Sequence, residues 1–238
     1  MVSSYTLPDG FSDFDVFSLG SCLLVEGLLG FFLNAVTVAA FLKIRELRTP
    51  SNFLVLSLAL ADMGISANAT IAAFSSFLRY WPYGSDGCQT HGFQGFVTAL
   101  ASIHFIAAIA WDRYHQYCTR TKLQWSSAIT LAIFIWLFTA FWSAMPLIGW
   151  GENYVSYLIP MAIFNMAIQT FVVMSSYQSI GQKFKKTGNP RLAPILAKTS
   201  PTFNVFLYAL GNENYRGGIW QFLTGEKIEV LQIENKFK

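Results

Sequence analysis

Hydrophobic residues in this chain gather into long runs, which short polar loops separate. Five of these runs reach the length of about 20 residues that an α-helix needs to cross a bilayer. They cover residues 16–42, 53–78, 89–111, 126–148 and 154–177. A sixth run, 191–211, contains prolines and Lys198, so its insertion energy is marginal. The pattern predicts an all-α membrane protein, a single bundle with five spans and one weaker Lys-containing span.

Basic residues in the short loops set the orientation of the bundle. The loops after the first, third and fifth runs carry several Lys or Arg, whereas the loop after the second carries only Arg79 and the loop after the fourth carries none. The positive-inside rule therefore places the N-terminus outside and the end of the fifth span in the cytosol. The polar first residues predict no cleaved signal peptide. We expect residues 213–223 to lie in the membrane interface and residues 225–238 to form a mobile tail.

Composition supports a protein of the lipid membrane. Charged residues make up 12% of the chain, about half of the roughly 25% that soluble domains carry. The net charge of +3 and the lack of a basic run interleaved with aromatics argue against a nucleic-acid partner. The cysteines fall on different predicted sides of the membrane, so we expect no intramolecular disulfide. No His/Cys cluster has metal-ligand spacing, so no metal site is expected.

Lys198 is the candidate for covalent chemistry. A lone ammonium in hydrocarbon is costly, so an intramembrane lysine indicates a functional site by default. Desolvation favours the neutral amine, which can attack an aldehyde and form a Schiff base. Alternatively, Lys198 snorkels to the interface or lines a wet crevice. The residues alone leave both interpretations open.

Other polar residues within the runs are also open to more than one interpretation. Asp62 lies deep in the second run and Asn34 lies in the first, where they could form an ion site, a polar network or a packing contact. The sequence Asp112-Arg113-Tyr114 ends the third run and could be a simple charged border. His91, near the outer end of the third run, is more often a satisfied polar group than a ligand or proton carrier.

Taken in order, these residues resemble those of rhodopsin-like receptors, and the exit of the fourth run, Pro146-Leu-Ile-Gly-Trp150, narrows the resemblance to opsins. Lys198, followed by Asn204 and Tyr208, stands where opsins have their retinal-attaching lysine and their Asn-Pro-x-x-Tyr motif. The stretch 81–102 is similar to one subfamily, the retinal G-protein-coupled receptor opsins of retinal pigment epithelium and Müller cells. The resemblance covers nearly the whole chain.

The resemblance implies a retinal-binding photoreceptor with photoisomerase-like activity. All-trans-retinal would be held as a Schiff base on Lys198 and converted by light to the 11-cis isomer, in intracellular or plasma membranes of retinal support cells. His91 stands where visual opsins place a glutamate counterion, and a neutral imidazole cannot take that role, so the imine would titrate readily. Phe93 and Phe96 would line an apolar slot. The resemblance assigns the remaining residues to a structural polar network (Asn34, Asp62, Asn204 and Tyr208) and to a motif that faces a G protein (Asp112, Arg113 and Tyr114).

The chain also departs from the opsin pattern. Val205 replaces the proline of the last motif, and the connection from Trp150 to Tyr154 is too short for the second extracellular loop of an opsin. Between Lys186 and Leu192, where an opsin has its sixth transmembrane helix, only five residues intervene, which is too few for a span. The chain therefore resembles a shortened family member. Two other functions stay open: a receptor that signals through a G protein, and a non-functional or modulatory variant that acts on a full-length opsin.

Overall fold

The computed structural model describes residues 12–150 and 154–186, and this part of the chain is a bundle of helices. Its long helices are α1 (Asp13–Lys43), α2 (Pro50–Leu78), α3 (Gly84–Tyr114), α4 (Trp125–Ala144), α5 (Tyr154–Ala162) and α6 (Ile168–Lys186). Short helical segments are η1 (Arg45–Leu47), η2 (His115–Thr119), η3 (Met145–Ile148) and η5 (Ile163–Ala167). Five helical stretches in this part are long and apolar enough to cross a membrane, which confirms the predicted helical membrane bundle. The sixth run lies outside the described residues.

The fifth span is built from three consecutive segments, α5, η5 and α6. Pro160 lies inside α5 and cannot donate a backbone hydrogen bond. The π-helical segment η5 follows at once, and the backbone N–H of Ile168 bonds to the carbonyl of Ile163. Single π turns inside α-helices are frequent at functional sites. The polar residue that this turn carries, Asn165, is completely buried.

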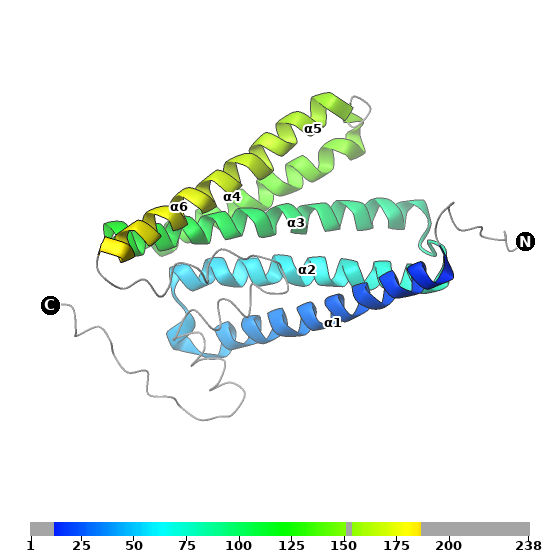
Figure 1. Cartoon of the computed structure of the whole chain (residues 1–238), viewed down its shortest axis with the longest axis horizontal. Helices are drawn as coiled ribbons and strands as arrows, with labels where there is room; N and C mark the ends of the chain where they lie inside the picture. Colours follow the sequence, from blue (N-terminus) through cyan, green and yellow to red (C-terminus); the bar gives the residue numbers. More distant parts are fainter. Residues whose placement is uncertain (1–11, 151–153, 187–238) are drawn as a thin grey trace, which may run out of the picture.

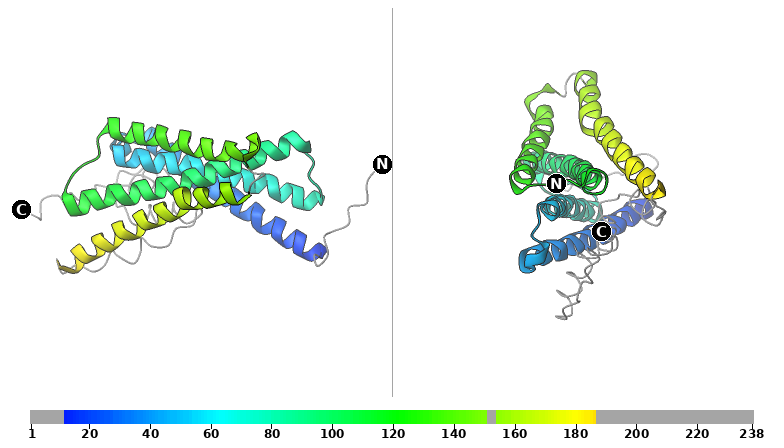
Figure 2. Two further views of the ribbon diagram at one scale, coloured as in Figure 1. Left: turned by 90° about the horizontal axis from the view of Figure 1, so that it is seen from above. Right: turned by 90° about the vertical axis from the view of Figure 1, so that its left-hand side faces the viewer.

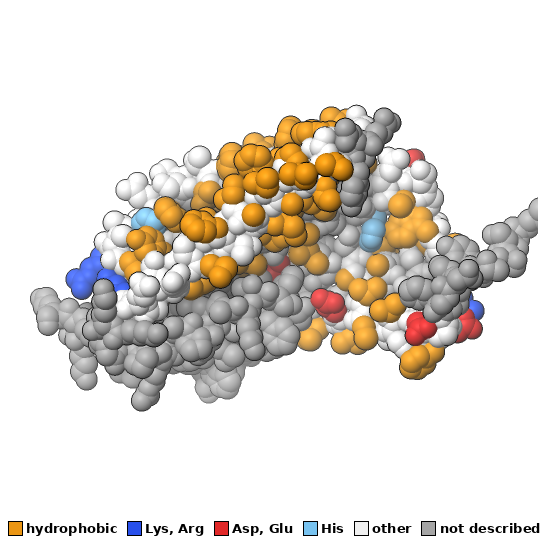
Figure 3. Space-filling view, turned by 45° about the horizontal axis from the view of Figure 1, so that its top comes forward, with side chains coloured by type: hydrophobic (Ala, Val, Ile, Leu, Met, Phe, Trp, Pro, Cys, Tyr) orange, Lys and Arg blue, Asp and Glu red, His pale blue; other side chains and the backbone are white. Residues whose placement is uncertain are grey.

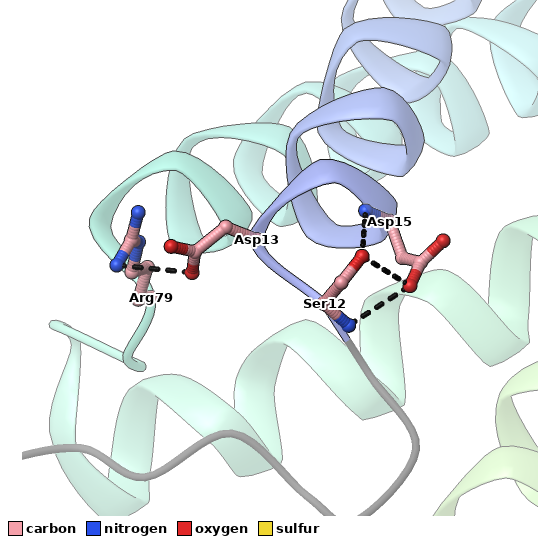
Figure 4. Close-up of polar contacts among 4 residues, drawn as sticks. All are labelled: Ser12, Asp13, Asp15 and Arg79. Atoms are coloured by element: carbon pink, nitrogen blue, oxygen red, sulfur yellow. Dashed lines mark hydrogen bonds and ion pairs between the residues drawn. The ribbon is translucent and has the colours of Figure 1, made fainter.

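The outer ends of α1 and α2 are held by local polar contacts (Figure 4). The hydroxyl oxygen of Ser12 accepts a bond from the Asp15 backbone N–H at 3.3 Å, and the Asp15 carboxylate accepts one from the Ser12 N–H at 2.8 Å. This reciprocal pair is a capping box, which starts α1 at Asp13. Asp13 also pairs with Arg79 at 3.1 Å, and both side chains are at least half exposed, so the pair adds little stability.

The first inner loop is closed by polar side chains. Thr49 caps α2 by accepting a bond from the Asn52 backbone N–H at 3.2 Å, and Pro50 occupies the first helical turn, where its missing N–H does no harm. The side chain of Asn52 donates to the Leu47 carbonyl at 3.0 Å. The guanidinium of Arg48 donates to the carbonyls of Phe41 and Leu42 at the end of α1. These bonds fix the turn between the first two spans.

Helices α1 and α2 approach closely because the contact face of α1 carries glycine. A Cβ atom on Gly27 would lie 2.4 Å from Thr70 Oγ1 and 2.8 Å from the Ser66 carbonyl oxygen. Both distances are too short for any side chain, so glycine is required here. Small residues at helix contacts are a general device of membrane proteins, in which dispersion contacts rather than the hydrophobic effect hold helices together.

Helix α3 occupies the centre of the described bundle, with α2 on one side and α4 and α6 on the other (Figures 1 and 2). Phe105, Ile109 and Ala101 of α3 form the core with Leu54 and Leu58 of α2. Large apolar side chains remain exposed on the outer surfaces of α4, α5 and α6, as a lipid-facing surface requires (Figure 3). Cys22, Cys88 and Cys118 all lie in the described part and are free, as expected.

Candidate functional site

The outer end of α3 places His91 against an aromatic side chain and α2. The ring of His91 lies 4.9 Å, centroid to centroid, from the ring of Trp81, and the Trp81 indole N–H donates to the Gly84 carbonyl at 2.9 Å. Asn68 of α2 donates to the main-chain carbonyl of His91 at 3.2 Å. The His91 Nδ1 atom is buried and has no hydrogen-bond partner among the described residues. His91 is therefore held in place through its backbone and ring, while one ring nitrogen stays available.

The same region of α2 and α3 is in very close contact. A Cβ on Gly95 would lie 2.0 Å from Asn68 Nδ2, and a Cβ on Gly64 would lie 2.4 Å from a methyl carbon of Thr98. Gln94 adds an interhelical bond from its side-chain amide to the Gly64 carbonyl at 3.1 Å. The glycines thus bring the polar side chains of α2 within reach of the α3 backbone next to His91.

A buried aromatic cluster lies between α3, α4 and α5. Trp142 is its centre: Leu100, Tyr157 and Met161 pack with it, and Phe96 lies against the same group. The hydroxyl of Tyr157 donates to the Trp142 carbonyl at 3.0 Å, which joins α5 to α4. Phe96, expected to line an apolar slot, belongs to this cluster, whereas Phe93 is half-buried outside it. The cluster offers an apolar and aromatic wall for an elongated hydrophobic ligand.

Asp62 lies at the centre of the bundle and is completely buried. Its carboxylate accepts a bond from the Ser102 hydroxyl of α3 at 2.7 Å, and Ser66 donates to its main-chain carbonyl at 2.8 Å. Asn34 is also buried, and its amide donates to the Gly30 carbonyl of its own helix at 2.9 Å. Asp62 thus links α2 to α3, whereas the described hydrogen bond of Asn34 stays within α1. Asn204 and Tyr208 lie outside the described residues, so the expected network of these four residues stays a prediction.

At the predicted cytosolic end, the acidic residue of the Asp112-Arg113-Tyr114 motif bonds to a residue in the next helical turn. Gln116 donates to the Asp112 carboxylate at 2.7 Å and to the Ser51 hydroxyl of α2 at 2.7 Å. Among the described residues, Asp112 makes no ion pair with Arg113. Asp112 is buried, whereas Arg113 and Tyr114 are half-buried. Asp112 therefore ties α3 to α2 and leaves the Arg113 guanidinium without a carboxylate partner in this part of the chain.

Not every residue singled out from the sequence falls in the described region. Lys198, the expected attachment site, lies outside it. Asn204 and Tyr208 lie outside it too. The structure places the described ones at three levels along the bundle: His91 at the predicted outer end, Asn34 and Asp62 near the centre, and Asp112-Arg113-Tyr114 at the predicted cytosolic end. Their proposed roles therefore belong to separate sites along α3 and its neighbours.

Sequence reasoning missed three polar residues of the spans. His104 and Asn165 are buried in α3 and η5, and Glu26 is exposed in the middle of α1. Each is a polar or acidic side chain within an apolar run, which is the signal that could have revealed them. His104 Nδ1 lies 2.8 Å from the Leu100 carbonyl, and its ring packs edge-on against Phe138.

Comparison with known proteins identifies the class. The family model for the 7 transmembrane receptor (rhodopsin family) matches residues 33–162. The fold is similar to that of the crystal structure of squid rhodopsin, with a TM-score of 0.77 over 92% of this chain and 89% of that chain at 19% sequence identity. At this low identity the likeness shows the shared fold alone.

Full-length relatives extend the match beyond the family model. The chain is 45% identical to the human RPE-retinal G protein-coupled receptor and 44% identical to the one from Bos taurus, each over 96% of this chain and 98% of the relative. The chain therefore belongs to the rhodopsin family of seven-transmembrane receptors, as the resemblance predicted. The alignments extend over 286 residues whereas this chain has 238, so the relatives contain internal residues that this chain lacks, as expected of a shortened form.

Proposed function

We propose that this protein is a retinal-binding opsin that holds all-trans-retinal as a Schiff base on Lys198 and converts it in light to the 11-cis isomer. One observation carries the proposal: the chain is 44–45% identical, over 96% of its length, to RPE-retinal G protein-coupled receptors. Lys198 supports it as the only lysine within any of the apolar runs.

The described residues fit an elongated apolar ligand. The aromatic cluster around Trp142 and Phe96 presents apolar surface from α3, α4 and α5. Retinal, when bound, supplies the aldehyde and the light-absorbing polyene. The chain's own part is to keep water from the amine of Lys198, to orient the polyene along the aromatic wall, and to leave the amine neutral and nucleophilic.

Attack of the Lys198 amine on the aldehyde forms one C=N bond and releases one water molecule. A dry site favours this product because water would reverse the reaction. His91 cannot act as an anionic counterion when it is a neutral imidazole, so the imine proton is weakly held. We therefore expect a pigment that absorbs in the blue when the imine is protonated and in the near ultraviolet when it is neutral.

The test is a spectrum of the purified chain after addition of all-trans-retinal, followed by borohydride reduction and peptide mapping. Retinal should be fixed on the peptide that contains Lys198, and Lys198→Ala should abolish the adduct. Lys183→Ala is the matched control, because the Lys183 amine donates to the Cys118 carbonyl at the cytosolic end and should not react. Equal labelling of several lysines would mean nonspecific chemistry and would overturn the proposal.

A second candidate function is a modulatory variant without a pigment of its own. The internal residues that the relatives have and this chain lacks favour this alternative, because a shortened bundle loses part of the wall of the retinal site. It predicts no retinal absorbance band from the chain alone. It also predicts a changed yield of pigment when the chain is expressed together with a full-length opsin.

A further inference from the structure

Three buried polar atoms without partners among the described residues lie on elements that pack together at the aromatic cluster. They are Nε2 of His104, Oδ1 of Asn165 and Nε1 of Trp142, and none has a hydrogen-bond partner among the described residues. The exposed fraction is 6% for His104, 6% for Trp142 and 0% for Asn165. A buried polar atom without a partner is destabilising, more so in a bilayer, so three on adjacent elements call for a common explanation.

The packing places these residues within about one helical turn of one another along the bundle. Leu100 of α3 and Met161 of α5 belong to the same buried cluster, and His104 and Asn165 follow them by one helical turn each. By the predicted orientation both spans run from the outside to the cytosol, so one turn further along each helix keeps the two side chains level. Trp142 packs in the same cluster, and its ring lies 6.1 Å from that of Phe164, the residue before Asn165.

The existing hydrogen bonds fix what each unpartnered atom can do. His104 Nδ1 lies 2.8 Å from the Leu100 carbonyl oxygen, so Nδ1 carries the proton and Nε2 of the neutral ring is an acceptor. Asn165 Nδ2 donates to the Met161 carbonyl at 3.1 Å, so its free Oδ1 is also an acceptor. The Trp142 indole N–H can only donate. The three atoms are therefore two acceptors and one donor.

His104 is expected to be neutral at this site. No Asp or Glu occurs in α4, α5, η5 or α6, and on α3 the only acids are Asp86 and Asp112 near its two ends. The Asp62 carboxylate of α2 bonds to Ser102, which is two residues from His104 and therefore lies on the opposite side of α3. An imidazolium buried between these helices would lack a carboxylate partner in the described residues and would be strongly disfavoured. Two acceptors cannot bond to each other, so His104 and Asn165 need a third group between them.

We propose that His104, Asn165 and Trp142 form a binding site for a single water molecule that joins α3, α4 and η5. The water donates one proton to His104 Nε2 and the other to Asn165 Oδ1, and it accepts the Trp142 indole N–H. This uses all three unpartnered atoms, and about three bonds is the usual number for a buried water. The site goes beyond the proposed retinal function and does not depend on it.

The direct test is nuclear magnetic resonance on the full chain in lipid nanodiscs, with indole nitrogens labelled. The Trp142 indole signal is assigned from its loss in Trp142→Phe. We expect a cross-peak between the Trp142 indole proton and water, which disappears in the double variant His104→Leu/Asn165→Leu. The indole of Trp136, which packs against Phe105, is the internal control and should not respond to that double variant.

Thermal unfolding gives a second readout. His104→Leu and Asn165→Leu should each lower the midpoint by about 2–6 °C, because each leaves the water with one bond fewer. The double variant should lower it by clearly less than the sum, since the first change already removes one of the bonds that hold the water and the second acts on a weakened site. Trp142→Phe combined with either variant should show the same shortfall.

Several results would overturn the proposal. If the Trp142 indole proton had no cross-peak with water, no water would be bound at this site. If the midpoint shifts were additive, the three side chains would act independently. If a nitrogen spectrum showed His104 as an imidazolium, its Nε2–H could donate directly to the Asn165 side-chain oxygen. No water between them would then be needed. None of these outcomes depends on retinal, so failure here leaves the proposed function standing, and failure of the Lys198 adduct leaves the water site standing.

Discussion

The bond between Ser102 and Asp62 is the best place to test how the centre of the bundle is held together. Ser102→Ala removes the hydroxyl that donates to the Asp62 carboxylate at 2.7 Å, and it leaves nearly all other atoms in place. Both residues are buried, at 3% and 0% exposure, so water cannot easily replace the lost donor. We expect the variant to fold and insert but to be measurably less stable.

Two considerations set the magnitude. A hydrogen bond to a charged group contributes about 1.5–3 kcal/mol in soluble proteins. Interhelical bonds in membranes contribute less, about 0.6 kcal/mol on average and up to about 1.7, because the unfolded chain in the bilayer also finds partners. The short, buried bond between Ser102 and Asp62 belongs near the top of the membrane range, so we expect a loss of about 1–2 kcal/mol. That corresponds to a midpoint about 3–6 °C lower.

The assay is thermal unfolding of the purified chain, followed by circular dichroism in one lipid or detergent. Ser57→Ala is the matched control, since Ser57 is equally buried, at 4% exposure, but donates to the Phe53 carbonyl of its own helix at 3.0 Å. Loss of such a local bond should change stability by less than about 0.5 kcal/mol. If Ser102→Ala and Ser57→Ala were equally stable, the bond between α2 and α3 would have no net value and the reasoning would fail.

Three further outcomes are expected. Gly95→Ala should displace Asn68 from the His91 carbonyl and lower stability by about 1–3 kcal/mol, while Gly92→Ala, which meets open space, should have little effect in the same unfolding assay. Light- or retinal-dependent nucleotide exchange on a G protein should be weak or absent, because the segment between Lys186 and Leu192 is too short to hold the sixth transmembrane helix of an opsin. Strong exchange by this chain alone would contradict this prediction. If the 191–211 run crosses the membrane, a tag after Lys238 should be protected from protease in sealed microsomes, and a cytosolic tag together with a buried Lys198 would contradict the five-plus-one span count.

The number and approximate place of the described spans could be predicted because the signal is simple. A run of about 20 apolar residues has few alternatives to a membrane helix, whatever its partners. The ends were less predictable, since helices continue beyond the hydrocarbon wherever capping allows. Helix α3, for example, starts at Gly84, before the predicted span, and so includes Cys88 within its first turns.

The side-chain arrangement of the site could be predicted only in part. Asp112 and Gln116 are four residues apart and share a helix face, so their contact follows from helical spacing. The bond from Gln116 to Ser51 depends on how α2 packs against α3, which the sequence alone does not determine. The π turn around Asn165 likewise has no sequence period of its own, and it became visible only with the backbone.

The level of Lys198 in the membrane decides how His91 can act. Lys183 donates to the Cys118 carbonyl at 3.0 Å, which holds the end of α6 at the cytosolic end of α3. Residues 187–190 alone precede the sixth run and span about 14 Å at most, less than the roughly 30 Å hydrocarbon core, so a run that inserts is predicted to enter from the cytosol. A helical run starting at residue 191 puts Lys198 about 10 Å above the cytosolic boundary.

His91 lies near the opposite boundary, because it is only two residues into the predicted span 89–111. Roughly 15 Å of bilayer then separates the Cα levels of His91 and Lys198 in this topology, more than their two side chains together can bridge, so the imidazole should not act on the imine. We therefore expect His91→Phe to leave both the absorption maximum of the Lys198 pigment and its dependence on pH unchanged. A clear spectral shift in His91→Phe would put the two residues at the same level. The chain between α6 and the sixth run is too short to allow that, so the shift would refute the predicted five-plus-one topology rather than the pigment itself.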